Sequence, residues 1–162
     1  MRRIDPKESP FSLSNANDSM FAESENFIAI YNLAPILPGH SLIVPKRYVV
    51  SLMELTEKEL CEMMAFSRRV VQVLLEIFKA DGFNWTIQDG EEAGQTVPHL
   101  HLHLIPRKEG DLPHPGDWYP KLKKSETELI DSAERPQLNS EELKRIAGHI
   151  KKYMGDLKPF SS

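Results

Sequence analysis

Three histidines alternate with leucines in one short segment, and they are the residues of this chain best suited to chemistry. His99, His101 and His103 are separated by Leu100 and Leu102. Successive side chains of a β-strand point to opposite faces, with a rise of about 3.3 Å per residue. We therefore expect the histidines to share one face of a strand, about 6.6 Å apart at the backbone, with the leucines against the core.

Two interpretations of this pattern do not involve catalysis. The histidines could form a solvated polar face, although strands more often use Thr, Lys or Glu there. Alternatively, His-x-His could place two imidazoles on one zinc ion, with His40 or a carboxylate completing the site. The chain has neither a Cys pair nor a His-Glu-x-x-His motif to support such a site.

The third interpretation is nucleophilic attack on phosphorus by a histidine. Imidazole is a good nucleophile near pH 7, and a phosphoramidate intermediate divides one difficult displacement into two easier ones. The nucleophile needs an acceptor on its second nitrogen, and the phosphate oxygens need donors. His101, the middle histidine, is best placed to attack. The donors could come from His99, His103, the Gln95 amide and backbone N–H groups of residues 94–97.

Hydrophobic periodicity predicts the elements that position these residues. Alternating or apolar runs predict strands at 27–31, 41–44, 83–88 and 98–106. Thr56 and Glu59 form a capping box that begins a long helix with an apolar stripe. A second helix follows Asn139 or Ser140. The chain is therefore expected to be an α+β protein.

Length and composition limit the broad class of protein. The 162 residues fit one domain, here 19–162, preceded by a polar, flexible N-terminal arm at 1–18. Periodicity disappears at 107–136, which predicts a mobile loop. A net charge of −4 argues against nucleic-acid binding by bulk charge, and no run approaches the ~20 apolar residues of a membrane span. A single cysteine and no signal peptide suggest a cytoplasmic protein, a nuclear location also being compatible.

Residues 99–105 resemble the signature of the histidine triad family, in which three histidines alternate with apolar residues. The similarity extends to Gln-Asp-Gly-Glu-Glu-Ala-Gly-Gln-Thr-Val-Pro at 88–98, to Ile-Pro-Arg-Lys at 105–108, and to Asn-Leu-Ala-Pro-Ile-Leu-Pro-Gly-His at 32–40. These segments resemble the fragile histidine triad branch of that family. About residues 21 to 124 can be matched in this way.

This resemblance implies both a fold and a reaction. The fold would be an antiparallel sheet with one long and one C-terminal helix, the triad on the exposed sheet face, in a homodimer. The reaction would be hydrolysis of dinucleoside polyphosphates, chiefly diadenosine triphosphate to AMP and ADP, through a covalent AMP intermediate on His101. Magnesium or manganese would ride on the substrate, and the triad would hold no metal.

The same resemblance implies roles for individual residues. His99 and His103 would flank the nucleophile, position phosphate and assist the leaving group. His40 would lie behind the triad, and Leu42 would form an apolar wall at adenine. The remaining contacts to the ribose and the phosphates would come from Asn32, Gln88, Gly94, Gln95, Thr96 and Val97.

Other members of the family differ at recognisable positions. Nucleoside phosphoramidases usually carry serine where Thr96 stands, and DNA-end-processing members add a zinc finger, for which this chain has no Cys/His set. Tyr119 falls where the fragile histidine triad branch has a tyrosine linked to signalling, but its flanks differ, so that role is not transferred. A nucleotide sensor with slow turnover would keep the same site residues. The 107–136 loop is expected to cover part of the bound substrate.

Overall fold

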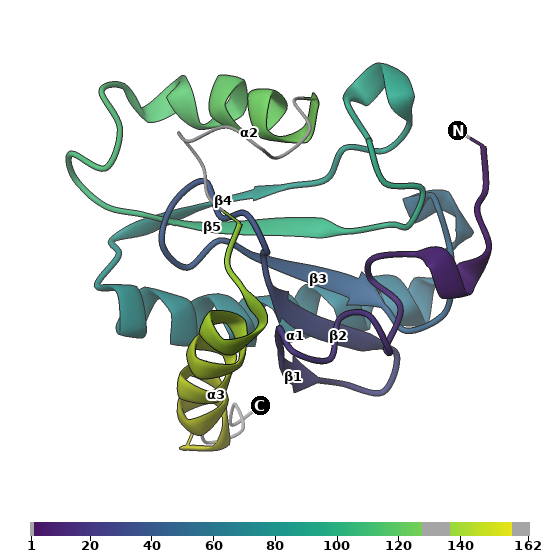
Figure 1. Cartoon of the computed structure of the whole chain (residues 1–162), viewed down its shortest axis with the longest axis horizontal. Helices are drawn as coiled ribbons and strands as arrows, with labels where there is room; N and C mark the ends of the chain where they lie inside the picture. The colour runs from purple at the N-terminus through teal and green to yellow at the C-terminus, as the bar shows by residue number, and fades with distance from the viewer. Residues whose placement is uncertain (1, 128–136, 157–162) are drawn as a thin grey trace.

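A five-stranded antiparallel sheet forms the centre of the part of the chain that the structure describes. The structure is a computed structural model that describes residues 2–127 and 137–156. The strands lie in the order β1 (Met20–Glu23), β2 (Phe27–Tyr31), β3 (Ser41–Pro45), β5 (Leu102–Arg107) and β4 (Gly82–Thr86). Figure 1 shows this sheet with the helices α1 (Glu57–Phe78), α2 (Trp118–Thr127) and α3 (Ser140–Asp156) around it.

Helix α1 covers one face of the sheet. Its start is the predicted capping box, in which Thr56 accepts from the Glu59 backbone and Glu59 accepts from the Thr56 backbone. Its apolar stripe, which includes Met63, Phe66 and Val70, packs on the sheet together with α3. Each large apolar side chain buried in this way contributes roughly 1.5–3 kcal/mol. This layer fixes the β5 backbone, because Leu102 and Leu104 point into it.

The N-terminal segment lies on the opposite face of the sheet, where a loose arm was expected at 1–18. Ser9 and Ala16 are buried, and Ala16 joins an apolar cluster with Ile28, Leu42 and Val44. The prediction of a flexible arm is therefore wrong for this segment, since its sparse apolar residues find a long-range packing surface. In Figure 1 the segment lies beside the end of β3.

Helix α2 covers the other part of that face, inside the segment predicted as a mobile loop at 107–136. Leu122 is buried against Ile36, Leu37 and Ile105, with Trp118 packed beside them. The loop prediction is thus wrong for 118–127. Among the described side chains of α2, Trp118 and Leu122 pack on this cluster, so the helix gives a weak periodic signal in the sequence. Pro120 lies in its first turn, where proline is tolerated. Residues 128–136 lie outside the described residues.

The strand boundaries also depart from the sequence-based expectation. Strand β1 was not predicted, and β4 ends at Thr86 rather than at 88. Strand β5 begins at Leu102, not at 98, because the His99 N–H bonds to the Val97 carbonyl in a tight turn and Pro98 has no N–H to give a ladder. The C-terminal helix starts as expected, with the Asn139 side chain accepting from the Glu142 backbone. No helix in the described parts of the chain is long and apolar enough to cross a membrane.

Candidate active site

His103 lies on β5 and is held from behind by His40. In the sheet, His103 pairs with Leu42 of β3, so the loop that leads into β3 brings His40 beside it. Both residues are buried. His40 Nε2 lies 2.9 Å from His103 Nδ1, while the backbone N–H of Ile36 donates to His40 Nδ1 at 3.2 Å.

This arrangement determines which nitrogens carry protons when both rings are neutral. A backbone N–H can only donate, so His40 Nδ1 accepts and the His40 proton lies on Nε2. His40 then donates to His103 Nδ1, which leaves the His103 proton on Nε2. A proton at Nε2 of His103 is available for a general-acid role.

His101 has the complementary arrangement. Its Nδ1 lies 2.8 Å from the carbonyl oxygen of His99, which can only accept. The proton of neutral His101 is therefore on Nδ1, and the lone pair is on Nε2. The rings of His101 and His103 lie edge to face, with centroids 4.9 Å apart. The unprotonated Nε2 of neutral His101 and the protonated Nε2 of neutral His103 thus belong to neighbouring rings.

His99 precedes β5, because the chain turns before the strand begins, but it lies on the same side as His101: the Phe11 ring packs on both, with centroids 6.1 and 5.0 Å away. Its Nε2 lies 3.1 Å from the Pro45 carbonyl and its Nδ1 lies 2.7 Å from the Ser9 hydroxyl. The predicted strand start at 98 is therefore wrong, although the side chains still alternate, since Leu100, Leu102 and Leu104 all lie in the core under α1. Burial lowers the pKa of His99 against the opposing effect of the Pro45 carbonyl, which favours a neutral ring near pH 7. A phosphate could contact this ring only by displacing one of its partners.

A cavity of about 410 Å³ opens beside His101 and His103. Its walls are mainly apolar and include Leu42 and, from the N-terminal segment, Phe11. Asn32 also lines the cavity; its Oδ1 accepts from the Ala34 backbone, so its amide N–H₂ is directed toward His40. An apolar cavity with few polar groups is the usual form of a small-molecule site.

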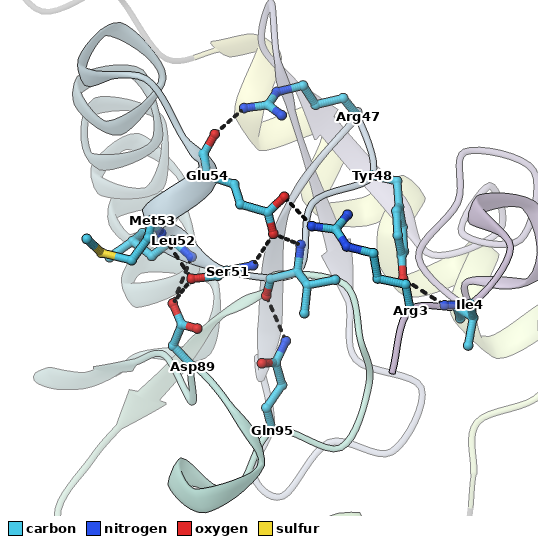
Figure 2. Close-up of polar contacts among 11 residues, drawn as sticks. Arg3, Ile4, Arg47, Tyr48, Ser51, Leu52, Met53, Glu54, Asp89 and Gln95 are labelled. Carbon is cyan, nitrogen blue, oxygen red and sulfur yellow. Dashed lines mark hydrogen bonds and ion pairs between the residues drawn. The ribbon is translucent and has the colours of Figure 1, made fainter. Parts of the chain in front are cut away.

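The loop before the triad lines a second cavity of about 250 Å³. Gln88, Gly94 and Gln95 lie there with Thr96, which borders both cavities. The Gln95 amide accepts from the Gly90 N–H and donates to the carbonyls of Val50 and Val97, so it holds the loop in shape. Figure 2 shows its bond to Val50.

Gln88 differs from Gln95 in its bonding. Gln88 is 5% exposed, and its Oε1 has no hydrogen-bond partner among the described residues. A buried polar atom without a partner is costly, and such an atom often marks a place where a ligand binds. Within the described residues, no three His, Cys, Asp or Glu side chains are grouped so as to hold a metal ion.

The structure brings together most of the residues that the sequence singled out. His101, His103, Asn32 and Leu42 line one cavity, with His40 bonded behind His103. The remaining residues form the rim of that cavity and the adjoining loop: Gln88, Gly94, Gln95, Thr96 and Val97. Sequence reasoning missed Ser9 and Phe11, because a polar segment gives no periodic signal of its packing. It likewise missed Leu122 and Leu143, which reach the cavity from α2 and α3.

Comparison with known proteins identifies the family to which this chain is similar. A model of the HIT domain matches residues 14–110. The asymmetrical bis(5'-nucleosyl)-tetraphosphatase of Schizosaccharomyces pombe is 43% identical over 76% of this chain and 68% of its own length. The bis(5'-adenosyl)-triphosphatase of Dictyostelium discoideum is 41% identical over 65% of this chain and 70% of its own length.

A solved structure agrees with these relatives in fold. The diadenosine triphosphate hydrolase of Plasmodium falciparum, crystallised with cyclomarin A, has a TM-score of 0.62 and 26% identity. The similarity covers 86% of this chain and 78% of that one. With a family model that spans more than half of its residues and relatives above 40% identity, this chain belongs to the HIT family.

Proposed function

We propose that this protein hydrolyses dinucleoside polyphosphates, chiefly diadenosine triphosphate, to AMP and ADP. The observation that carries the proposal is the hydrogen bond from His101 Nδ1 to the His99 carbonyl at 2.8 Å, which leaves the lone pair of this cavity-lining ring on Nε2. The relatives that match this chain are named for hydrolysis of such dinucleotides. They differ in polyphosphate length, so both lengths belong in the test.

The reaction follows from the two tautomers. His101 Nε2 attacks the phosphorus next to one adenosine, forming a P–N bond while the P–O bond to ADP breaks. His103 donates its Nε2 proton to the leaving oxygen. The proton is on Nε2 because His40 donates to His103 Nδ1. Water then attacks the phosphorus of the phosphoramidate and gives up a proton to Nε2 of His103. The P–N bond breaks, and AMP is released from His101. The net change is the addition of one water across one anhydride bond.

The remaining site residues would hold the substrate. Asn32 would bind the ribose hydroxyls, and Leu42 would lie against adenine, since both line the larger cavity. The Gln88 amide, through its N–H₂ group, and the backbone N–H groups of residues 94–97 would face the polyphosphate. Magnesium or manganese would bind with the substrate and neutralise its charge, while His40 positions His103.

The experiment that tests this function compares wild type with His101→Ala on diadenosine triphosphate and tetraphosphate in the presence of magnesium. We expect wild type to release AMP from both substrates and His101→Ala to lose at least a thousandfold in kcat. His149→Ala is the matched control, because His149 is exposed on α3, and it should keep wild-type activity. Equal turnover by His101→Ala would show that His101 is not the nucleophile. An inactive wild type would contradict the proposed function.

We also propose that the protein forms a homodimer. Strand β4 is an edge of the sheet, and its Phe83 is 42% exposed next to Trp85, with ring centroids 6.0 Å apart. An edge strand with an exposed aromatic side chain is a common site of self-association. Light scattering on the full chain would test this, a monomeric mass contradicting it. Localisation in the cytoplasm, or the nucleus as well, is likewise a proposal that microscopy of the tagged chain can test.

A further inference from the structure

The N-terminal strap, defined here as residues 3–16, is attached at its far end to the loop that follows β3. Arg3 forms an ion pair with Glu54 at 2.6 Å, and the Ile4 N–H donates to the Tyr48 hydroxyl at 3.1 Å. Both contacts are drawn in Figure 2. The Arg3 guanidinium also lies 5.9 Å from the centre of the Tyr48 ring. The edge of that ring packs on His99, with centroids 5.3 Å apart, so the attachment lies next to the triad.

Ser9 is the residue of the strap that bonds to the triad, through His99. Its side chain is fully buried, and its backbone carbonyl accepts from the Asn15 amide at 2.8 Å, which closes the strap into a compact turn. The Ser9 hydroxyl accepts from the Phe11 N–H at 3.2 Å and lies 2.7 Å from His99 Nδ1. An exposed serine would exchange such bonds with water, but the Ser9 hydroxyl is buried and bonds to protein groups.

The direction of the Ser9 bond follows from the other side of the ring. The Pro45 carbonyl can only accept, so the proton of neutral His99 lies on Nε2. His99 Nδ1 is then an acceptor, and the Ser9 hydroxyl donates to it. The His99 ring is therefore held between two protein groups and restricted to one tautomer and one orientation.

His99 passes this restriction to the nucleophile. The carbonyl oxygen of His99 is the atom that accepts from His101 Nδ1, so a shift of His99 moves the group that aims His101. The strap acts on the nucleophile a second time through Phe11, whose ring centroid lies 5.0 Å from that of His101. One segment thus orients the attacking ring through a hydrogen bond and through packing.

We propose that Ser9 is a positioning residue for the reaction: its hydroxyl, delivered by the N-terminal strap, holds His99 and thereby aims the His101 nucleophile. The inference rests on the proposed function for its catalytic consequence, but the restriction of His99 to one tautomer can be tested without any substrate. Small displacements of a nucleophile have large effects, because a misplacement of about 1 Å can lower a rate about a hundredfold.

The experiment replaces the hydroxyl in the full chain. Ser9→Ala removes the donor, and Ser14→Ala is the matched control, since Ser14 is exposed on the same strap and does not line the cavity. We expect Ser9→Ala to lower kcat for diadenosine triphosphate at least tenfold with KM changed less than threefold. Ser14→Ala should match wild type. Ser9→Cys, which keeps a weak donor, should give an intermediate kcat and guards against a folding defect in the alanine variant.

A second readout separates positioning from general damage. Nitrogen-15 spectra of the histidine rings in the free protein report which nitrogen carries the proton. Wild type should show His99 as the Nε2–H tautomer, and Ser9→Ala should show a mixture. Wild-type kcat in Ser9→Ala, or a lowered kcat with an unchanged His99 spectrum, would overturn the proposal. If wild type hydrolyses no dinucleotide, the proposed function fails, and the His99 spectra alone decide whether Ser9 restricts the ring.

Discussion

Replacing His40 tests the hydrogen-bonded relay behind His103. His40 is fully buried: it accepts from the Ile36 N–H and donates to His103 Nδ1, and the Asn32 amide lies within 3.5 Å of its ring nitrogens. In His40→Leu the volume is roughly kept, but both partners are left buried without a bond. Each such group costs about 1–3 kcal/mol, so the free energy of unfolding should fall by roughly 2–6 kcal/mol. For a chain of this size that corresponds to a decrease in Tm of roughly 4–24 °C.

His40→Gln separates the two bonds. A glutamine amide can place its N–H₂ near the position of the imidazole Nε2, so it can still donate to His103 while the Ile36 N–H loses its acceptor. We expect about half of the loss in stability and a kcat at least tenfold above that of His40→Leu, because the proton of His103 stays on Nε2.

The assays are urea unfolding followed by tryptophan fluorescence, and kcat for diadenosine triphosphate. His149→Leu, an exposed position on α3, serves as the control and should change neither quantity. The reasoning would be refuted by a His40→Leu variant whose unfolding free energy lies within about 0.5 kcal/mol of wild type. It would also be refuted by equal activity of the Leu and Gln variants, because the donor to His103 would then be irrelevant.

Two further predictions concern the scaffold. The Arg47 guanidinium lowers the pKa of Glu59 to about 2 from the ordinary 4.5, so its stabilising effect is complete above pH 4.5 and is lost as the pH falls toward 2. Glu59→Gln should lower the unfolding free energy by about 1–2 kcal/mol at pH 7, allowing for solvent screening, and by almost nothing near pH 2; a pH-independent difference in urea unfolding would contradict this. Gly39 has φ of +89°, and a Cβ there would lie 2.7 Å from Phe78. Gly39→Ala should cost about 2–4 kcal/mol in thermal unfolding, whereas Gly82→Ala, with open space around it, should cost less than about 1; equal losses would show that the contact does not matter.

Local sequence signals predicted the parts of the fold that depend on local physics. The apolar run at 27–31 is a buried strand, and the Thr56 capping box begins α1 where expected. These features succeed because neighbouring residues determine them, through alternation in a strand and through side-chain caps in a helix. The meeting of His40 and His103 was anticipated only through resemblance, since no local pattern places a loop histidine behind a strand.

The failures share a physical cause. The strand was extended back to residue 98, but Pro98 cannot continue the ladder and the chain turns there, so β5 begins at Leu102. Ser9 and Leu122 lie in segments without periodicity, and each is buried by residues distant in the sequence. Long-range contacts of this kind depend on the finished sheet face. They cannot be recognised from the composition of the segment that makes them.

The division of the cavity walls has a consequence for how such a protein can change over evolution. His101 and His103 lie within residues 14–110, the segment that matches the family, whereas Phe11, Leu122 and Leu143 reach the same cavity from outside it. Substitutions in the two ends of the chain can therefore reshape the cavity next to His101 without altering either histidine. The chemistry is inherited with the central segment, and selectivity among nucleotides can diverge at the periphery.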